Sequence, residues 1–298
     1  MGQTILVTGS TSGFGRLTVE TLARQGHTVF AGIRARTSKN AQVDDELRTL
    51  AQQEHLALHV VELDVTDDIS VDKAVQQVIE IAGQLDVVVN NAGTLFTGPL
   101  ETFTATQVQQ QFDTNVFGVL RMNRAALPHM RARGSGLLLQ IGSAAGRLAF
   151  PFSGLYGATK FALEGLTESY RYELAALGID AVIVEPGTYP TTLISNRFLP
   201  LDEGRVAPYG PVMEMFMGRF MEDLVTTPPN PQEVADAVAT LIATPAGKRP
   251  LRTVVALQNQ AAPVRALNEQ AERLERDYLD MLGVTDLLTL VPGRVSAQ

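Results

Sequence analysis

Residues 4–24 read TILVTGSTSGFGRLTVETLAR, and this stretch decides the fold. It begins with a short apolar run of the kind that forms a buried strand, and it ends with a segment of helical periodicity. Between them, Gly9, Gly13 and Gly15 let the chain turn tightly and let a phosphate group approach the backbone. The helix after the turn would add free N–H groups and the positive end of its dipole. The stretch therefore predicts a strand–turn–helix unit with a phosphate site.

The alternation of strand and helix continues along the 298-residue chain. The further apolar runs are 28–30, 58–61, 87–89, 137–139, 181–184 and 253–255. They are apolar on both faces, as strands covered by helices on both sides must be. Segments of helical length separate them, for example residues 157–177. We therefore expect an α/β fold, a doubly wound Rossmann sheet of about seven parallel strands with helices on both faces.

The composition excludes several classes of protein. The chain contains no cysteine, which excludes disulfides, thiolate metal sites and a cysteine nucleophile. Its apolar fraction of 45% excludes intrinsic disorder, and its formal charge of −8 argues against a nucleic-acid surface. No apolar run approaches the roughly 18 residues of a membrane span, and the opening MGQTILVTGS does not resemble a signal peptide. We therefore expect a cytoplasmic protein with no nucleic-acid partner and no membrane span.

The end of the second strand indicates which dinucleotide would bind. Arg34 and Arg36 follow it, and no acidic residue lies between positions 26 and 40. In this fold an acidic residue there binds the adenosine ribose hydroxyls, whereas an arginine accommodates a 2′-phosphate. Two solvated surface arginines would give the same basic pattern, so the missing acid is the firmer observation. The sequence favours NADP(H), with NAD(H) as the alternative.

Tyr156 and Lys160 form a candidate acid–base pair. Their spacing of four residues in a helical segment places them on one face, with Cβ atoms about 5–6 Å apart. A phenol with a pKa near 10 is a poor acid–base group at neutral pH. A nearby ammonium group would stabilise the phenolate and lower that pKa. The pair could then exchange a proton with an alcohol or a carbonyl oxygen.

An ordered set of motifs includes both the glycine turn and this pair. The set consists of the glycine pattern 8–15, Asp64, Asn90-Asn91-Ala92-Gly93, Asn115, Ser143, Tyr156-x-x-x-Lys160 and Pro186-Gly187. The chain resembles the compact branch of the short-chain dehydrogenase/reductase family over residues 4–192. The resemblance implies an oxidoreductase that forms a homodimer or a homotetramer.

The resemblance also implies a role for each matching residue. Tyr156 would be the general acid–base, and Lys160 would lower its pKa and bind the nicotinamide ribose. Ser143 would hold the substrate oxygen, and Asn115 would anchor a water in a proton relay to Lys160. The implied cofactor-binding residues are Gly9, Ser10, Thr11, Ser12, Gly13, Phe14, Gly15, Arg34, Asp64, Val65, Asn91, Ala92, Gly93, Tyr156, Lys160, Pro186, Gly187, Tyr189 and Thr191. Tyr189 departs from the family, which usually has an aliphatic residue or Phe at this position.

No metal site is expected. His55 and His59 have the four-residue spacing of some metal ligands, but the surrounding sequence reads as a strand. Residues four apart on a strand share a face at a separation of roughly 13 Å, which one metal ion cannot bridge.

Residues 192–231 and 261–298 are additions to a single Rossmann-type domain spanning residues 1–298. The first segment carries an apolar helical stretch, Met213, Phe216, Met217, Phe220, Met221 and Leu224. Such a stripe usually packs on a core, but in the family this insertion covers the substrate, and a methionine-rich lid suits a bulky apolar ligand. The second segment is a C-terminal helix and tail. Its apolar face would dock on the domain or on a second subunit, and it consists of Val264, Leu267, Ala271, Leu274, Tyr278 and Leu282.

The sequence thus predicts an NADP(H)-dependent oxidoreductase. Hydride would pass between nicotinamide and a carbonyl or secondary alcohol of a lipophilic substrate, with Tyr156 moving the proton. The lid and the Pro186-Gly187 turn resemble those of retinoid and steroid dehydrogenases. Two alternatives remain, a non-catalytic NADP(H)-sensing regulatory protein and a sugar-nucleotide epimerase. The intact Tyr156 and Lys160 pair argues against the sensor, and the glycine spacing argues against the epimerase.

Overall fold

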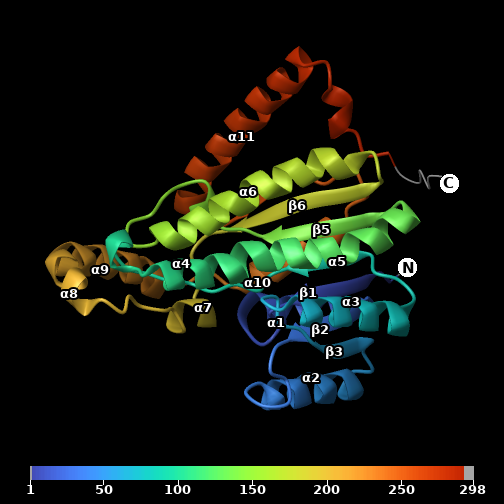
Figure 1. Ribbon diagram of the computed structural model, residues 1–298, viewed down its shortest axis with the longest axis horizontal. Helices are drawn as coiled ribbons and strands as arrows, with labels where there is room; N and C mark the ends of the chain where they lie inside the picture. Colours follow the sequence, from blue (N-terminus) through green and yellow to red (C-terminus); the bar gives the residue numbers. More distant parts are fainter. Residues whose placement is uncertain (1, 292–298) are drawn as a thin grey trace.

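The computed structural model describes residues 2–291, apart from the side chains of Glu203 and residues 221–225. Across the described residues, seven parallel strands form one sheet in the order β3-β2-β1-β4-β5-β6-β7 (Figure 1). The strands are β1 Thr4–Thr8, β2 Thr28–Ile33, β3 Leu58–Glu62, β4 Val87–Asn90, β5 Gly136–Ile141, β6 Ile179–Pro186 and β7 Arg252–Val255. The predicted doubly wound Rossmann fold is confirmed.

Helices cover both faces of the sheet. The main helices are α1 Gly13–Arg24, α2 Ala41–Gln53, α3 Asp68–Ala82, α4 Ala105–Phe112, α5 Gly118–Arg133, α6 Gly154–Ala175, α10 Gln232–Ala243 and α11 Gln258–Met281. α1, α2 and α10 pack on one face with Ile5 and Val7, whereas α3, α5 and α6 pack on the other face with Leu6. Successive residues of β1 therefore point into two different cores, which explains why this strand is apolar throughout.

The strand order places the predicted site residues at one edge. β1 lies between β2 and β4, so the sheet order reverses there, and Val7 of β1 pairs with Val89 of β4. Asn90 at the end of β4 pairs with Gln140 of β5. Loops after the carboxyl ends of parallel strands meet at such a switch point, where open α/β sheets bind their ligands. The glycine turn and the turns after β4, β5 and β6 all leave the sheet at this edge.

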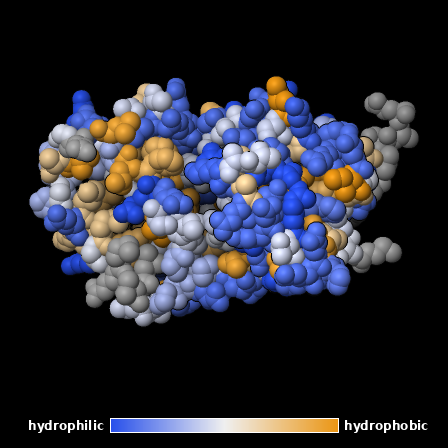
Figure 2. Space-filling view, turned by 90° about the horizontal axis from the view of Figure 1, so that it is seen from below, coloured by the Kyte–Doolittle hydropathy of each residue, from blue (hydrophilic) through white to orange (hydrophobic). Residues whose placement is uncertain are grey.

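Residues 192–231 contain α7 Thr192–Ser195, α8 Glu203–Val206 and α9 Gly210–Thr226. The segment is tied to the loop after β4 because the Phe198 N–H donates to Leu95 O (2.8 Å) and the Thr97 N–H donates to Phe198 O (3.1 Å). Figure 2 shows apolar side chains gathered at the end of the molecule that carries α8 and α9. The exposed apolar residues of this segment are Phe198, Leu199, Leu201, Val212 and Met215. The side chains of Met221 and Leu224, predicted on the same stripe, lie outside the described residues.

The C-terminal helix α11 projects from the body of the molecule (Figure 1). Its buried residues are Ala261, Val264, Asn268 and Leu279, whereas Leu267, Leu274, Tyr278 and Leu282 are exposed. Of the predicted apolar face, the described part of the domain therefore buries Val264 and partly buries Ala271, and the other four residues stay exposed. After α11 the chain returns to the body, where the Val291 N–H donates to Ala175 O at the end of α6 (3.0 Å). The predicted tail beyond residue 291 lies outside the described residues. Within the described part of the chain, no helix is both long and apolar enough to cross a membrane.

Candidate active site

The glycine turn forms a cradle of backbone groups. Gly9 and Gly13 have positive φ angles of 68° and 55°, which residues with a side chain rarely adopt. A Cβ atom at Gly9 would lie 2.8 Å from Ala92 Cα, and one at Gly15 would lie 2.4 Å from Asn91 Nδ2. Ser12 precedes α1 without capping it by a side-chain hydrogen bond, so N–H groups of the first turn stay available. The cradle therefore fits the diphosphate of a dinucleotide.

The turn after β4 holds this cradle in place. Thr8 Oγ1 accepts hydrogen bonds from the N–H groups of Asn91 (3.0 Å) and Ala92 (2.9 Å). The Asn91 amide in return donates to Thr8 O (2.9 Å) and Gly9 O (3.1 Å). Gly93 lies beside Asn115, since a Cβ atom there would be 3.5 Å from Asn115 Oδ1. Asn91 and Ala92 thus shape the floor of the site through the backbone of the glycine turn.

The other predicted residues of the glycine turn divide into two groups. The Ser10 hydroxyl is buried and donates to Val7 O (2.9 Å), and its N–H donates to Gly32 O (3.1 Å), so Ser10 keeps no donor free for a ligand. Thr11 and Ser12 remain partly exposed at the turn, and Ser12 Oγ lies 2.6 Å from Thr192 Oγ1. Phe14 packs edge-on against Tyr189 with ring centroids 5.4 Å apart. The glycine turn therefore contacts the turn after β6.

At the adenosine end, Arg34 and Arg36 differ in their surroundings. The Arg36 guanidinium pairs with Asp44 (3.1 Å), whereas the Arg34 side chain is exposed and has no ion-pair partner among the described residues. Glu62 accepts hydrogen bonds from the N–H groups of Ala35 (2.7 Å) and Arg36 (3.1 Å), which fixes the loop that carries both arginines. Arg34 is therefore the arginine available to a 2′-phosphate.

Asp64 and Val65 follow β3 at the same end of the site. Asp64 Oδ1 accepts from Thr66 N–H (2.9 Å) and Thr66 Oγ1 (2.7 Å), which caps its own turn. Val65 is buried against Gly118, where a Cβ atom would lie 2.8 Å from Val65 Cγ2. Both residues thus hold the wall of the adenosine end in shape.

Asn115 lies in a π-helical segment, Asp113–Phe117, between α4 and α5. Such segments are rare and are often found at functional sites. Asn115 Oδ1 accepts from Thr94 N–H (2.8 Å), and Asn115 Nδ2 donates to Thr94 O (3.0 Å) and Thr159 Oγ1 (3.1 Å). The Thr159 hydroxyl in turn donates to Tyr156 O (2.7 Å). The Asn115 side chain thus links the turn after β4 to the first turn of α6.

Ser143, Tyr156 and Lys160 come together as the sequence predicts. Ser143 follows β5 and forms a side-chain hydrogen bond with Tyr156, while its oxygen also accepts from Ala145 N–H (3.1 Å). Lys160 Nζ lies 5.5 Å from the centroid of the Tyr156 ring. It donates to Ile141 O (2.7 Å), which holds the buried ammonium group at the end of β5. Three polar side chains, one from the turn after β5 and two from α6, therefore lie together at the carboxyl end of the sheet.

The pKa of Tyr156 differs from the expectation. Burial raises the pKa of the phenol to about 12, although the hydrogen bond with Ser143 acts in the opposite direction. Burial also lowers the pKa of Lys160 to about 8, against the field of Glu164. The net shift of the Tyr156 pKa is therefore upward, opposite to the expected net lowering, because desolvation dominates both groups.

The turn after β6 is held by residues that the motifs did not indicate. The Gly187 N–H donates to Val255 O (2.9 Å), and the Thr188 N–H donates to Gln260 Oε1 of α11 (2.9 Å). A Cβ atom at Gly187 would lie 2.5 Å from that oxygen, so only glycine fits beside Gln260. Pro186 ends β6, and the Thr191 N–H donates to Tyr189 O (2.8 Å). The far end of the chain thus fixes a turn that the family resemblance assigns to nicotinamide.

The Tyr189 side chain points into the core, not into the site. It is 2% exposed, and its hydroxyl lies 3.0 Å from Glu233 Oε2 and 3.2 Å from Val255 O. Burial and the Glu233 carboxylate raise the pKa of this phenol. Tyr189 therefore acts as a core residue, and only its backbone takes part in the turn after β6.

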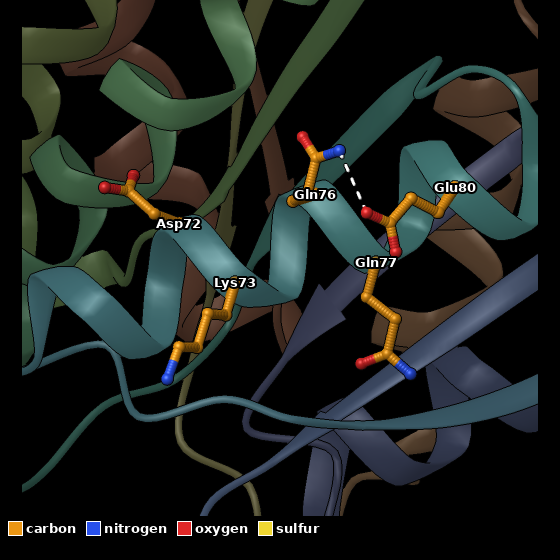
Figure 3. Close-up of a pocket in the computed structure, with 5 residues that line it drawn as sticks. All are labelled: Asp72, Lys73, Gln76, Gln77 and Glu80. Atoms are coloured by element: carbon orange, nitrogen blue, oxygen red, sulfur yellow. Dashed lines mark hydrogen bonds between the residues drawn. The ribbon is translucent and has the colours of Figure 1, made fainter.

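One surface pocket lies apart from this site. It is lined by Asp72, Lys73, Gln76, Gln77 and Glu80 of α3 (Figure 3). All five residues come from one helix, and Gln76 donates to Glu80 (3.1 Å) along that helix. This is a solvated helix face, and no group of other elements converges on it. Among the described residues there is also no group of three or more His, Cys, Asp or Glu side chains that could hold a metal ion.

The arrangement matches a known family over two thirds of the chain. A sequence model described as short chain dehydrogenase matches residues 3–200. The chain belongs to the short-chain dehydrogenase family. Short-chain dehydrogenases are oxidoreductases that use nicotinamide cofactors and act on small substrates.

Curated members of the short-chain dehydrogenase family are similar over most of the chain. A 3-ketodihydrosphingosine reductase of Bacteroides thetaiotaomicron is 39% identical over 195 residues, which cover 65% of this chain and 67% of that protein. Human 17-beta-hydroxysteroid dehydrogenase type 1 is 33% identical over 248 residues, which cover 81% of this chain and 74% of that protein.

Solved structures of the family share the fold. A short-chain dehydrogenase from Streptomyces avermitilis matches with a TM-score of 0.73 and 32% identity, covering 95% of this chain and 97% of that one. The structure titled ElxO with NADP bound matches with a TM-score of 0.69 and 26% identity, covering 86% of this chain and 97% of that one.

Proposed function

We propose that this short-chain dehydrogenase transfers a hydride between NADP(H) and a carbonyl or secondary alcohol of a lipophilic substrate, with Tyr156 as the general acid–base. The observation that carries the proposal is the meeting of Ser143, Tyr156 and Lys160 beside the glycine cradle. A dinucleotide bound there supplies or accepts the hydride. The chain itself supplies the proton and the groups that hold the reacting oxygen.

In the direction of carbonyl reduction, the Tyr156 O–H donates its proton to the substrate oxygen. Ser143 holds that oxygen beside the phenol, because its hydroxyl already hydrogen-bonds the phenol oxygen. The phenolate that results is stabilised by Ser143 and by the charge of Lys160, whose position Ile141 O fixes. Asn115 holds the first turn of α6, and thus Tyr156, in register with the turn after β4. Oxidation of an alcohol uses the same groups in reverse.

The preference for NADP(H) rests on Arg34. This side chain is exposed at the end of β2 with no described ion-pair partner, while Glu62 uses its carboxylate on backbone N–H groups of the same loop. A free guanidinium group binds a 2′-phosphate, and the Glu62 carboxylate is already engaged by the backbone of the loop. The presence of NADP in the ElxO structure supports the same preference.

The lipophilic substrate is proposed from the aromatic side chains of residues 192–231 and the loops they contact. Phe198 stacks on Phe96 with ring centroids 4.7 Å apart, and Phe216 of α9 lies 5.7 Å from Phe152. Phe152 lies in the turn before α6, four residues before Tyr156 in the chain. We therefore assign residues 192–231 as a substrate lid that offers aromatic rings to an apolar substrate. The named substrates of the two relatives, a ketosphingoid and a hydroxysteroid, are lipophilic as well.

Assembly into a dimer or tetramer is supported by two exposed rings. Phe117 of the π-helical segment and Phe161 of α6 are 48% and 46% exposed on the elements that carry Asn115 and Tyr156. Apolar rings on adjacent helices favour contact with a second copy. Sedimentation of wild-type protein and of a Phe117→Ser, Phe161→Ser variant tests this assembly. Monomeric wild-type protein would contradict it.

The deciding experiment replaces Tyr156 by Phe. With NADPH and a panel of apolar ketones, the variant is expected to lose about a thousandfold in kcat, the contribution of a general acid–base. Its affinity for NADPH, measured by nucleotide fluorescence, serves as the control and should stay within about twofold. Wild-type rates in the variant would contradict the mechanism. Dinucleotide binding without any turnover would support the sensor, and NAD retained through purification would support the epimerase.

A further inference from the structure

A cluster of buried ionisable side chains lies one helical turn beyond the catalytic lysine. Glu164 of α6, Glu185 of β6 and Arg252 of β7 are 3%, 0% and 6% exposed. Ionised groups are costly in an apolar interior unless they are paired. The mechanism described above uses none of the three, so their place behind Lys160 needs its own explanation.

The spacing along α6 places Glu164 on the same face as Lys160. Tyr156, Lys160 and Glu164 follow one another at intervals of four residues. Lys160 and Glu164 both pack against Gly146, where a Cβ atom would lie 3.0 Å from Lys160 O and 3.2 Å from Glu164 Cγ. The Glu164 charge raises the pKa of Lys160, in opposition to burial. Glu164 is therefore the acidic group that acts most directly on the lysine.

Arg252 forms an ion pair with Glu164, which favours the ionised form of the Glu164 carboxyl. Arg252 Nε lies 2.9 Å from Glu164 Oε2, and its Nη2 lies 2.5 Å from Glu168 Oε2. Burial raises the pKa of Glu164, and the charge and hydrogen bond of Arg252 lower it. Without the guanidinium group, the buried carboxyl would take up a proton and lose its effect on Lys160.

Glu185 supplies a second support. The Oε1 atoms of Glu164 and Glu185 are both buried with no other hydrogen-bond partner among the described residues, so a hydrogen bond between the two carboxyl groups would satisfy both. Two carboxyl groups form such a bond only when one of them carries a proton. Burial and the nearby Glu164 charge raise the pKa of Glu185 to about 8, so Glu185 is the donor at neutral pH. Asn268 of α11 fixes its orientation, since Asn268 Nδ2 donates to Glu185 Oε2 (2.5 Å).

Every element packed around Glu164 contributes to this cluster. The charged and titratable groups are Tyr156, Lys160 and Glu168 on α6, Glu185 on β6, Arg252 on β7, Arg147 before α6 and Glu275 on α11. Arg147 lowers the pKa of Glu164, as Arg252 does. Burial and the neighbouring Glu168 carboxylate raise the pKa of Glu275 to about 7.

We propose that Glu164 is a positioning residue for catalysis, which keeps the Lys160 ammonium group charged beside Tyr156 and is itself held by Arg252 and by the protonated Glu185. The inference rests on the proposed function, since a charged Lys160 matters only if it supports the Tyr156 phenolate. Arg252 and Asn268 lie beyond residue 200, outside the part of the chain that the family model matches. The C-terminal third thus helps to set the charge of the catalytic centre.

The first test titrates Lys160 in the free protein. The chain has four lysines, Lys39, Lys73, Lys160 and Lys248, and all but Lys160 are exposed, so ε-¹³C-lysine NMR resolves a small set of signals. A Lys160→Arg variant assigns the buried signal. Glu164→Gln is expected to lower the Lys160 pKa by about one pH unit, and Glu164→Asp should keep it near the wild-type value. The control is Glu272→Gln, which removes the same charge from the exposed face of α11 and should change nothing.

An unchanged Lys160 pKa in Glu164→Gln would overturn the inference. Should that variant fail to fold because Arg252 loses its buried Glu164 partner, Glu164→Gln combined with Arg252→Met removes both charges and takes its place. Its Lys160 pKa should be lowered as well. This titration needs neither dinucleotide nor turnover, so its outcome is independent of the proposed function.

The second test follows kcat against pH with NADPH and an apolar ketone. One limb of the kcat–pH profile should follow the ionisation of Lys160. In Glu164→Gln this limb should shift to lower pH by the same amount as the Lys160 pKa measured by NMR, and in Glu164→Asp it should lie near its wild-type position. A lowered NMR pKa with an unmoved profile would instead contradict the role given to Lys160 in the proposed function, and with it the catalytic part of this inference.

The third test locates the shared proton. A pKa of about 8 for Glu185 in the folded state lies above its ordinary value of about 4.5, so the folded protein holds a proton that the unfolded chain releases between these values. The free energy of unfolding should therefore fall as pH rises from about 5 to 8. Glu185→Gln still donates to Glu164 but cannot titrate, so urea unfolding should show a flatter dependence on pH. Equal slopes for the wild type and the variant would overturn the assignment of the proton to Glu185.

Discussion

The dinucleotide half and the catalytic half of the molecule build their sites in different ways. Around β1 and β4, the site consists mainly of backbone groups, and glycine residues make room for them. Around β5, β6 and β7, the site consists of side chains from distant elements, such as Lys160 on Ile141 and Gln260 beneath Gly187. The geometry of the dinucleotide half therefore depends on glycine residues that leave room for the backbone. The geometry of the catalytic half depends on contacts between side chains and groups that are distant in the sequence.

The largest effect is expected when a single methyl group is added to the glycine turn of the dinucleotide half, which tests whether that half depends on backbone groups. Gly9→Ala is expected to abolish NADPH binding, because the new Cβ would meet Ala92 Cα at 2.8 Å and would force the cradle open. Gly83→Ala is the matched control, since Gly83 has a φ of 74° and open space around it. Both variants should lose about 1 kcal/mol of unfolding free energy through the positive φ. Normal NADPH binding by Gly9→Ala in a fluorescence titration would show that the backbone cradle is not the phosphate site.

The next largest effect is expected at Arg34, the side chain to which we assign the preference for NADPH over NADH. Arg34→Glu is expected to reduce the preference for NADPH over NADH by about a hundredfold, because a carboxylate repels the 2′-phosphate and binds ribose hydroxyls. The measurement is kcat/KM with each dinucleotide. Arg265→Glu makes the same change of charge at an exposed site on α11 and should leave the ratio unchanged. An equal ratio in Arg34→Glu and in the wild type would remove the basis for NADP(H).

A smaller effect is expected on the substrate side. Phe216→Ala removes a ring that lies 5.7 Å from Phe152 and should raise KM about tenfold for long apolar ketones, while small polar ketones should be affected little. Tyr278→Ala removes an exposed aromatic ring from α11 and serves as the control. If both kinds of ketone change equally, the lid does not select for apolar substrates.

Some residues of the site could be predicted from the sequence, whereas others could be found only in the structure. The glycine turn, Arg34 and the Tyr156–Lys160 pair are local patterns whose spacing follows from strand and helix geometry, so they were predictable before any contact was known. Glu164 also stands at the four-residue spacing, and extending that stripe by one turn would have indicated it. Arg252 and Gln260 could not be found in this way, because their partners lie 88 and 72 residues away in the chain.

The pKa of Tyr156 illustrates the same limit. The spacing correctly brings an ammonium group to the phenol, but spacing carries no information on burial. In the structure, Lys160 Nζ lies 5.5 Å from the centroid of the Tyr156 ring, and burial raises the pKa of the phenol to about 12. Similarly, α11 has a clear apolar stripe, yet Leu274 and Tyr278 on it are exposed, because the helix contacts the body through the neighbouring face with Ala261 and Asn268.

The smallest effect is expected at Tyr189, where the sequence departs from the family. Tyr189→Phe removes a hydroxyl that lies 3.0 Å from Glu233 in the core, not in the cleft. We expect a loss of about 1 kcal/mol in unfolding free energy, the size of one buried hydrogen bond, and unchanged kcat and KM. A thermal melt and a kinetic assay under the same conditions check both statements. A marked change in kcat without loss of stability would place the phenol in the site.

The contact between Ser12 and Thr192 bears on the order of events in a catalytic cycle. Ser12 belongs to the diphosphate cradle, Thr192 is the first residue of the lid, and their hydroxyl oxygens lie 2.6 Å apart. The proposed lid therefore starts in contact with the proposed diphosphate site. From this contact we expect ordered kinetics for the proposed function, in which the dinucleotide binds before the substrate and leaves after the product.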